Sequence, residues 1–343
     1  MEIILAIKDS LQQAAGSFKN NRGMALLLTI LIVSVIVVAT LQFNTAMRTD
    51  LQAAANLRDG VKLGYNARSA FNLARTVLLE DGRENDYDTL QESWAKLPLL
   101  AEYSASYLDE GRFELKIADH AGRIQINGLV YAEDEIVRQL QRELFTRLLL
   151  SEEFGLDSEE VESILAAVID WLDENDEETG FGGAENSYYQ SLEKPYAVRN
   201  GPVESVEELL HIKGIGRGLF YGNDEHPGIM SFLTPYGVDG MVNINTADPM
   251  VLRALAEPID EELAGEMVTY RDEDEDNDLA NSNWYKNVPA FPGDVDIPAE
   301  ILSVSSSYFE VRARAYLGTM SRTVTGVIHR EADSTEIVTW KID

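Results

Sequence analysis

A long uncharged stretch near the N-terminus dominates the hydrophobic pattern of the chain. Residues 24–47 contain no charged side chain, and residues 24–41 contain only two threonines and one serine as polar residues. As a helix this stretch would rise about 36 Å, which exceeds the roughly 30 Å of a bilayer's hydrocarbon core. The 23 residues before it carry three basic and two acidic side chains, which weakly favours a cytoplasmic N-terminus. The pattern predicts a single-pass membrane anchor.

Two other readings of this stretch are weaker. A cleaved signal peptide would explain the A-x-A pattern at Ala53 and Ala55. However, the apolar run is longer than the roughly 7–15 residues usual in such peptides, and a long leader precedes it. A buried core helix rarely shows so long an uncharged run.

Two kinds of periodicity follow the anchor. Over residues 48–80 apolar residues recur at three- and four-residue steps, which predicts an amphipathic helix that ends at Asp81 and Gly82. Residues 101–128 change to alternation, with short runs at 103–107, 113–117 and 124–126 separated by turn signals. We expect these runs to form an antiparallel meander.

The middle of the chain is helical by pattern, and alternation returns only near its end. Helices are predicted over residues 133–150 and from Ser158 onward, and Ser205 begins a capping box. Strands are expected at 304–317, 320–329 and 336–342. The simplest fold class is α+β: a helix and antiparallel sheet built from residues 24–128 and 301–343. An inserted all-α domain, residues 129–300, interrupts this sheet.

The charge narrows the possible functions. The 343 residues include 28 Lys and Arg against 59 Asp and Glu, a net charge of −31. Residues 152–185 contribute −13 and residues 257–278 contribute −10, so most of the acidity belongs to the insert. So negative a surface opposes binding to nucleic acid. The absence of cysteine excludes disulfides and thiolate chemistry.

The strongest candidate for chemistry is a metal site in the first acidic stretch. Clustered carboxylates, an amide and free loop carbonyls provide the hard oxygens that Ca²⁺ prefers. The candidate ligands are Asp170, Asp173, Asn175, Asp176 and Glu185. A solvated acidic loop is the alternative, and composition alone does not choose between the two.

A second acidic run offers a weaker candidate. Its alternating carboxylates are Asp272, Asp274, Asp276 and Asp278. A plain solvated loop is the favoured interpretation there, because no glycine turn or distal ligand follows.

Two other classes of function were weighed. Residues 210–216 and 245–248 resemble pieces of helix-hairpin-helix DNA-binding modules, with Lys213 and Arg217 as the local cations. The surrounding negative charge favours a packing scaffold instead. For catalysis, the four histidines lack metal-ligand spacing, and the chain has no G-x-S-x-G motif and no P-loop. We therefore expect a non-enzymatic protein, with an anchored hydrolase as a minor alternative.

The N-terminal segment resembles that of type IV pilin-like proteins. In that family a prepilin peptidase cuts after a glycine directly before the apolar run and the new N-terminus is methylated. The corresponding bond here joins Gly23 to Met24. Most pilins carry Glu at the fifth mature position, whereas this chain has Leu28. A carboxylate at that depth in the membrane is costly unless paired. In the family this glutamate is thought to meet the N-terminal amine of a neighbouring subunit. A chain that lacks the glutamate therefore fits the position of a subunit with no neighbour ahead of it.

With the split sheet and large insert, the chain resembles the general secretion pathway protein K family, the minor pseudopilins of type II secretion. The motifs that carry this resemblance are Asp170-Trp171-Leu172-Asp173, Gly183-Ala184-Glu185 followed by Tyr188-Tyr189, Ser205-Val206-Glu207-Glu208-Leu209, Val242-Asn243-Ile244-Asn245-Thr246-Ala247 and Ser305-Ser306-Ser307-Tyr308-Phe309.

The resemblance implies an organisation and a set of partners. Residues 1–23 would be the prepilin leader, 24–47 the membrane span, 48–128 a pilin-like helix with first strands, 129–300 the insert, of helix-hairpin-helix or SAM-like type, and 301–343 the last strands. The protein would be anchored in the bacterial inner membrane with its bulk in the periplasm, and would cap a pseudopilus. Expected partners are minor pseudopilins I and J, the major pseudopilin and prepilin peptidase. Calcium would bind the insert, and no nucleic acid is expected. A membrane-anchored DNA-binding protein of the competence type is the alternative.

Overall fold

The computed structural model describes residues 21–108, 110–223, 226–273 and 277–343. The chain divides into two compact units, one up to Lys62 and one from Leu63 to Asp343. The expected leader, residues 1–23, lies almost entirely outside the described residues.

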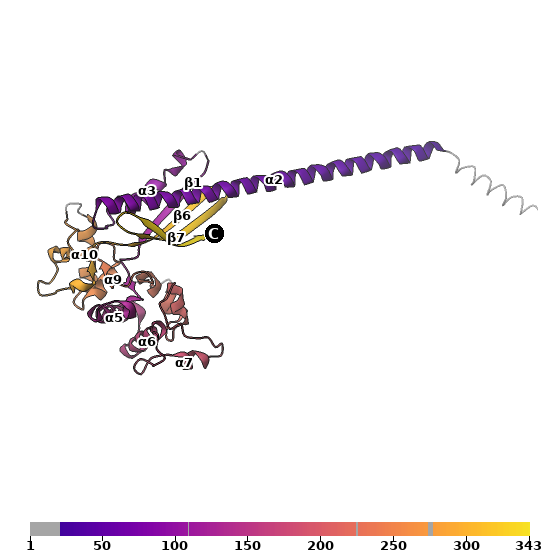
Figure 1. Ribbon diagram of the computed structural model, residues 1–343. Helices are drawn as coiled ribbons and strands as arrows, with labels where there is room; N and C mark the ends of the chain where they lie inside the picture. Colours follow the sequence, from indigo (N-terminus) through magenta and orange to yellow (C-terminus); the bar gives the residue numbers. More distant parts are fainter. Residues whose placement is uncertain (1–20, 109, 224–225, 274–276) are drawn as a thin grey trace, which may run out of the picture. The chain divides into compact units, whose positions relative to one another are not determined.

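A single helix, α2 (Asn21–Glu84), contains the apolar stretch (Figure 1). By length and composition it could cross a membrane. This supports the expected anchor. The prediction that the helix ends at Asp81 and Gly82 is wrong, because both belong to its last turns. Asp81 is held there by an ion pair with Arg330, and a Cβ on Gly82 would lie 3.0 Å from the Arg330 side chain.

The sheet joins the two ends of the second unit. Its strands are β1 (Arg112–Asp119), β6 (Tyr308–Leu317), β7 (Met320–Arg330) and β8 (Thr335–Ile342). They pair antiparallel in the order β1-β6-β7-β8, which confirms the three adjacent C-terminal strands. The C-terminal part of α2 packs on one face of this sheet (Figure 1), with Phe71 and Leu78 in a core shared with Val311 and Val324.

The predicted meander after α2 is largely wrong. Residues 93–106 form α3 (Ser93–Ala101) and a 3₁₀ turn (Ser104–Ser106), so the expected strand at 103–107 is absent. Of the three strands predicted for this meander, only the second, observed as β1, joins the main sheet. The chain turns away after it, because the Asp119 carboxylate accepts the backbone N–H of Ala121. The next segment, β2 (Ile124–Gln125), pairs in parallel with β3 (Leu233–Thr234) instead.

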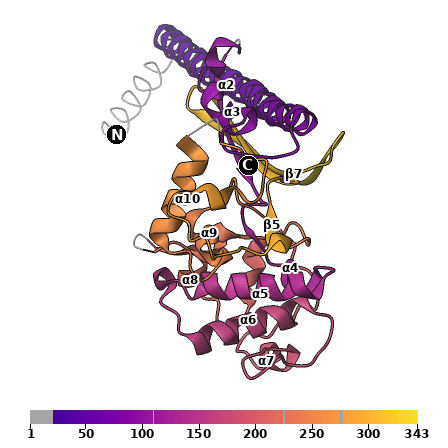
Figure 2. The ribbon, with the colours of Figure 1, turned by 90° about the vertical axis from the view of Figure 1, so that its left-hand side faces the viewer.

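The segment between β1 and β6 has its own hydrophobic core and is mainly helical. Figure 2 shows two of its helices, α5 (Glu135–Leu149) and α6 (Ser158–Leu172), side by side. Its helices are α4 (Gly128–Tyr131), α5 (Glu135–Leu149), α6 (Ser158–Leu172), α7 (Asn186–Gln190), α8 (Arg217–Tyr221), α9 (Pro249–Leu255) and α10 (Glu261–Glu273). Short 3₁₀ turns lie at Glu152–Phe154, Val206–His211, Ile229–Phe232, Trp284–Asn287 and Ala299–Ile301.

The expectation of an all-α insert needs correction. Besides the β2–β3 pair, β4 (Val242–Asn243) pairs in parallel with β5 (Leu302–Ser303). Two-residue strands are too short to show alternation, so the sequence pattern could not reveal them. The predicted helices at 133–150 and 158 onward are confirmed. The capping box at Ser205 is confirmed with Glu208, although it begins a 3₁₀ turn and not an α-helix.

Candidate functional site

The acidic loop after α6 is folded around one buried carboxylate. Asp170, in the last turn of α6, has no solvent exposure. It accepts the backbone N–H groups of Thr179 at 2.9 Å and Ala184 at 2.6 Å. A Cβ on Gly183 would lie 2.3 Å from an Asp170 carboxylate oxygen. The glycine-rich loop is therefore required for the close approach of backbone to this carboxylate.

Asp173 and Asn175 shape the beginning of the loop. The Asp173 carboxylate accepts the backbone N–H of Asn175 at 3.1 Å, and the Asn175 side-chain oxygen accepts that of Glu177 at 2.7 Å. Both are turns in which a short polar side chain caps its own backbone. Burial raises the pKa of Asp173, and the Asp170 carboxylate adds to the rise.

Glu185 is the unusual member of the group. It is 3% exposed, and neither carboxylate oxygen accepts a hydrogen bond of ordinary geometry from the described residues. Burial raises its pKa to about 7, and the carboxylates of Asp170, Asp173 and Asp176 contribute to the rise. The backbone N–H of Asn186 offsets only part of it. A buried carboxylate in acidic surroundings is costly unless a cation compensates it.

Asn200 is a residue that the sequence analysis missed. Its side-chain amide donates to the backbone oxygen of Asn175 at 3.2 Å and to the Asp176 carboxylate at 3.1 Å. Its own side-chain oxygen is buried and has no hydrogen-bond partner among the described residues. The backbone of Asn200 has φ = 49°, a left-handed conformation that asparagine tolerates better than most residues. The only sequence signal was the Asn-Gly pair, which indicates a turn and not a ligand.

The predicted ligands are only partly brought together: among the described residues, the group of three carboxylates within 4.8 Å of one another is Asp81, Asp88 and Glu92, outside the acidic loop. Asp176 lies beside Asn200, and Asp170, Asp173 and Asp176 all act electrostatically on Glu185. The two carboxylate oxygens of Glu185 and the side-chain oxygen of Asn200 are buried atoms that no described protein group uses. Carboxylate and amide oxygens in a flexible loop are ligands typical of Ca²⁺. The second predicted set of ligands stays a prediction, because Asp274 and Asp276 lie outside the described residues. Of its other members, Asp272 forms an ion pair with Arg271.

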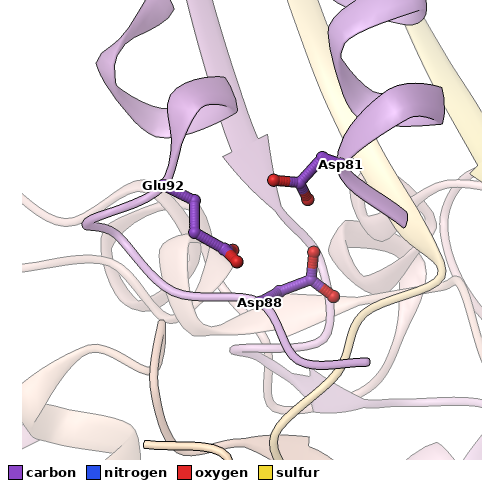
Figure 3. Close-up of side chains that lie close together, drawn as sticks. All are labelled: Asp81, Asp88 and Glu92. Carbon is purple, nitrogen blue, oxygen red and sulfur yellow. The ribbon is translucent and has the colours of Figure 1, made fainter. Parts of the chain in front are cut away.

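A second carboxylate cluster lies at the end of α2, and the sequence analysis missed it. Figure 3 shows Asp81, Asp88 and Glu92 facing a common space, and their nearest oxygens all lie within 4.8 Å of one another. The buried guanidinium of Arg330 donates to Asp81 at 3.0 Å and to both oxygens of Asp88 at 2.5 and 2.6 Å. The cation that this cluster requires is thus part of the chain.

The cluster belongs to a larger polar junction between the sheet and the insert. Asn243 of β4 donates to the backbone oxygen of Asp88 at 3.1 Å and to the Ser306 hydroxyl at 2.8 Å. The buried Asp119 carboxylate accepts the hydroxyls of Ser306 at 2.6 Å and Thr246 at 2.5 Å. We call these residues the polar junction: Asp81, Asp88, Asp119, Asn243, Thr246, Ser306 and Arg330. Their bonds join α2, β1, β4 and β7.

The two basic side chains of the hairpin that resembles DNA-binding modules, Lys213 and Arg217, contact other groups of the protein. The Lys213 ammonium donates to the backbone oxygens of Gly182 at 3.0 Å and Gly183 at 3.3 Å. Arg217 lies over the ring of Tyr221. Lys213 thereby fastens the hairpin to the acidic loop.

A helix apolar enough to cross a membrane, an antiparallel sheet packed against the C-terminal part of that helix and a mainly helical segment inserted between the strands fit the class of membrane-anchored pilin-like proteins. Comparison with known proteins agrees. Residues 122–220 and 242–312 match two family models, both described as type II secretion system protein K. The chain belongs to the type II secretion system protein K family of minor pseudopilins.

Curated relatives match along most of the chain. Type II secretion system protein K of Aeromonas hydrophila is 24% identical, over 93% of this chain and 96% of the relative. The protein of the same description from Pseudomonas aeruginosa is 25% identical, over 92% and 90%. Among solved structures, the GspK-GspI-GspJ complex from enterotoxigenic Escherichia coli contains a chain similar in fold. Its TM-score is 0.66 at 18% identity, covering 84% of this chain and 99% of that one.

Proposed function

We propose that this minor pseudopilin caps the tip of the periplasmic pseudopilus and helps to initiate its assembly for export across the outer membrane. The observation that carries this proposal is the insert. It adds a second hydrophobic core to the pilin-like helix and sheet, and a subunit of that bulk fits the end of a fibre better than its shaft. Leu28 in place of the usual Glu supports the same position.

The partners follow from the same proposal. The structurally similar chain was solved in a complex with GspI and GspJ. By analogy this chain assembles with minor pseudopilins I and J in a tip complex, and the major pseudopilin forms the shaft below. We take residues 129 and 300 as the limits of the insert. Before assembly, the inner membrane would hold the apolar part of α2, residues 24–47.

Processing by prepilin peptidase between Gly23 and Met24 is part of the proposal. Determining the N-terminal sequence of the mature protein tests it. A start at Met24 is expected, whereas a start near Asn56 would indicate an ordinary secreted protein.

We also propose a structural Ca²⁺ ion in the acidic loop. Glu185, Asp173, Asp176 and Asn200 would hold it, and Asp170 would keep the loop closed around it. The ion would supply positive charge for the buried oxygens of Glu185 and Asn200. The support for this proposal is the pair of unpartnered buried groups described above.

Labelling of isolated pseudopili tests the capping role. An antibody against the insert should mark one end of each fibre, and an antibody against the major pseudopilin should mark the shaft. Label from the insert antibody along the shaft would contradict the proposal.

The competence-type alternative predicts instead that the chain binds duplex DNA tightly at low salt and loses it as salt rises.

A further inference from the structure

The face of the sheet that points away from α2 carries a row of cations in a strongly acidic chain. Neighbouring residues on a strand point to opposite faces. Val311 and Ala313 are buried against α2, so Arg312 between them points outward. The pairing register places Lys116 opposite Arg312, Arg312 opposite Thr325, and Thr325 opposite Lys341. We call Lys116, Arg312, Thr325 and Lys341 the cationic row. It crosses all four strands.

One end of the row, on β1 and β6, is an arrangement that costs stability. Like charges directly opposite each other on adjacent strands repel, and Lys116 and Arg312 are such a pair. Both are exposed, and neither has an ion-pair partner among the described residues. The cation at the other end of the row, Lys341 on β8, forms an ion pair with Asp343 at 3.1 Å. Only 28 of the 343 residues are basic, so two unpaired cations in direct opposition require a reason.

Neighbouring side chains hold a further cation on the same face. Arg112 and Arg314 both lie over the ring of Tyr316, at 3.9 and 5.1 Å from its centre. Arg112 also pairs with Glu114 at 2.8 Å, whereas Arg314 donates to the hydroxyl of Ser321 at 3.1 Å. Glu114 lies directly opposite Arg314 and interacts electrostatically with both arginines, so these two arginines and one carboxylate leave one net positive charge beside the row.

We propose that the cationic row is a docking surface for an acidic polypeptide segment of a partner protein. Charge complementarity selects this occupant. A flat anionic membrane or a nucleic acid would meet the field of the whole chain, whose net charge is −31. A single acidic segment can instead cover Lys116 and Arg312, whereas Thr325, further along the row, lines a hollow with Glu204 and Glu207 of the insert. With strands about 4.8 Å apart, the row spans about 14 Å, which suits an extended segment of four or five residues with carboxylates at alternating positions. The inference goes beyond the proposed capping role.

Binding of a labelled peptide to the full chain in neutral detergent micelles tests the proposal. The probe is an alternating Glu-Gly peptide about ten residues long, and the matched control is its Gln-Gly counterpart. The expected result is salt-sensitive binding of the Glu peptide only. Lys116→Gln with Arg312→Gln should weaken it at least about tenfold, because two unpaired cations are lost. The control variant, Arg83→Gln with Lys286→Gln, removes two exposed cations that are already paired elsewhere and should leave binding unchanged.

Two further measurements separate this role from a structural one. Removing the Lys116–Arg312 repulsion should keep or raise the melting temperature, and a clear fall would overturn the proposal. Arg312→Glu should reverse the preference, so that this variant binds a Lys-Gly peptide more tightly than the Glu-Gly peptide. Equal binding by the double Gln variant would also overturn the proposal. So would displacement of the peptide by phosphatidylglycerol in the micelles, because the row would then recognise a lipid headgroup.

Discussion

Two buried groups of carboxylates in the second unit solve the same electrostatic problem in different ways. In the polar junction, the guanidinium of Arg330 lies between Asp81 and Asp88 and donates to both. In the acidic loop, Glu185 is as deeply buried, but no described basic side chain pairs with it. Burial raises the pKa to about 7 in both Asp88 and Glu185. The junction therefore has its own cation, whereas in the loop either a proton on Glu185 or the cation proposed above would neutralise the buried charge.

The largest expected effect is the loss of the internal cation. Arg330→Met would leave Asp81 and Asp88 buried without an ion-pair partner, and removing one member of a buried pair typically costs about 3–5 kcal/mol. Urea unfolding of the full chain in micelles would measure the change, which should be the same with and without Ca²⁺. Arg83→Met is the matched control. Its pair with Glu80 is exposed, so the loss should stay within about 1 kcal/mol.

A calcium effect of the Arg330 change would break the comparison. If Arg330→Met destabilised the chain only in Ca²⁺, the junction and the loop would be one coupled site and not two independent ones.

The second effect is that of the external cation. Ca²⁺ that binds only the folded loop should raise the free energy of unfolding, by about 2.7 kcal/mol at a free concentration of one hundred times Kd. Melting curves in Ca²⁺ and in EDTA measure it. Glu185→Gln should abolish the difference while leaving the EDTA form as stable or more so, because the buried charge is removed. If the unmodified chain melted identically in Ca²⁺ and in EDTA, the proposal of a calcium site would be wrong.

How far sequence alone could predict these features depended on the length of the pattern. The helices α5 and α6 and the strands β6, β7 and β8 have periodic runs long enough to identify. The helix α3 was missed, and Pro98 in its interior is a residue that normally ends a helix. Asp88, Asn243 and Ser306 are short polar residues in or beside loops. Nothing local distinguishes them from exposed ones, since only the tertiary structure buries them.

The candidate loop was only partly predictable for the same reason. Acidic spacing indicated Asp170, Asp173, Asp176 and Glu185, but it could not show that Asp170 is used by backbone N–H groups. Nor could it include Asn200, which lies 24 residues beyond Asp176 and reaches it only through the fold.

A smaller effect should appear when pH is varied without Ca²⁺. The pKa of Glu185 is raised from 4.5 to about 7 in the folded chain. The folded state therefore binds the proton more tightly than the unfolded state. The stabilisation from that proton is fully present below pH 4.5 and is lost as pH rises through 7. Melting temperatures in EDTA should fall between pH 5 and pH 7.5, and Glu185→Gln should reduce that fall. Asp88 titrates in the same range, so the difference between the two chains is the informative quantity.

The smallest effect should come from Asn200. Asn200→Ala removes one unpartnered oxygen from the loop and also the amide that holds Asp176 and the backbone oxygen of Asn175. Changing even a group that only positions a ligand typically lowers metal affinity about tenfold or more, so losing a ligand oxygen should raise the Kd for Ca²⁺, measured by titration followed by melting, by at least about that factor. Asn200→Gly keeps the left-handed backbone accessible and provides the matched control for strain at φ = 49°. If both variants bound Ca²⁺ as tightly as the unmodified chain, Asn200 would be a turn residue only, and Glu185 would be the one buried group that depends on the ion.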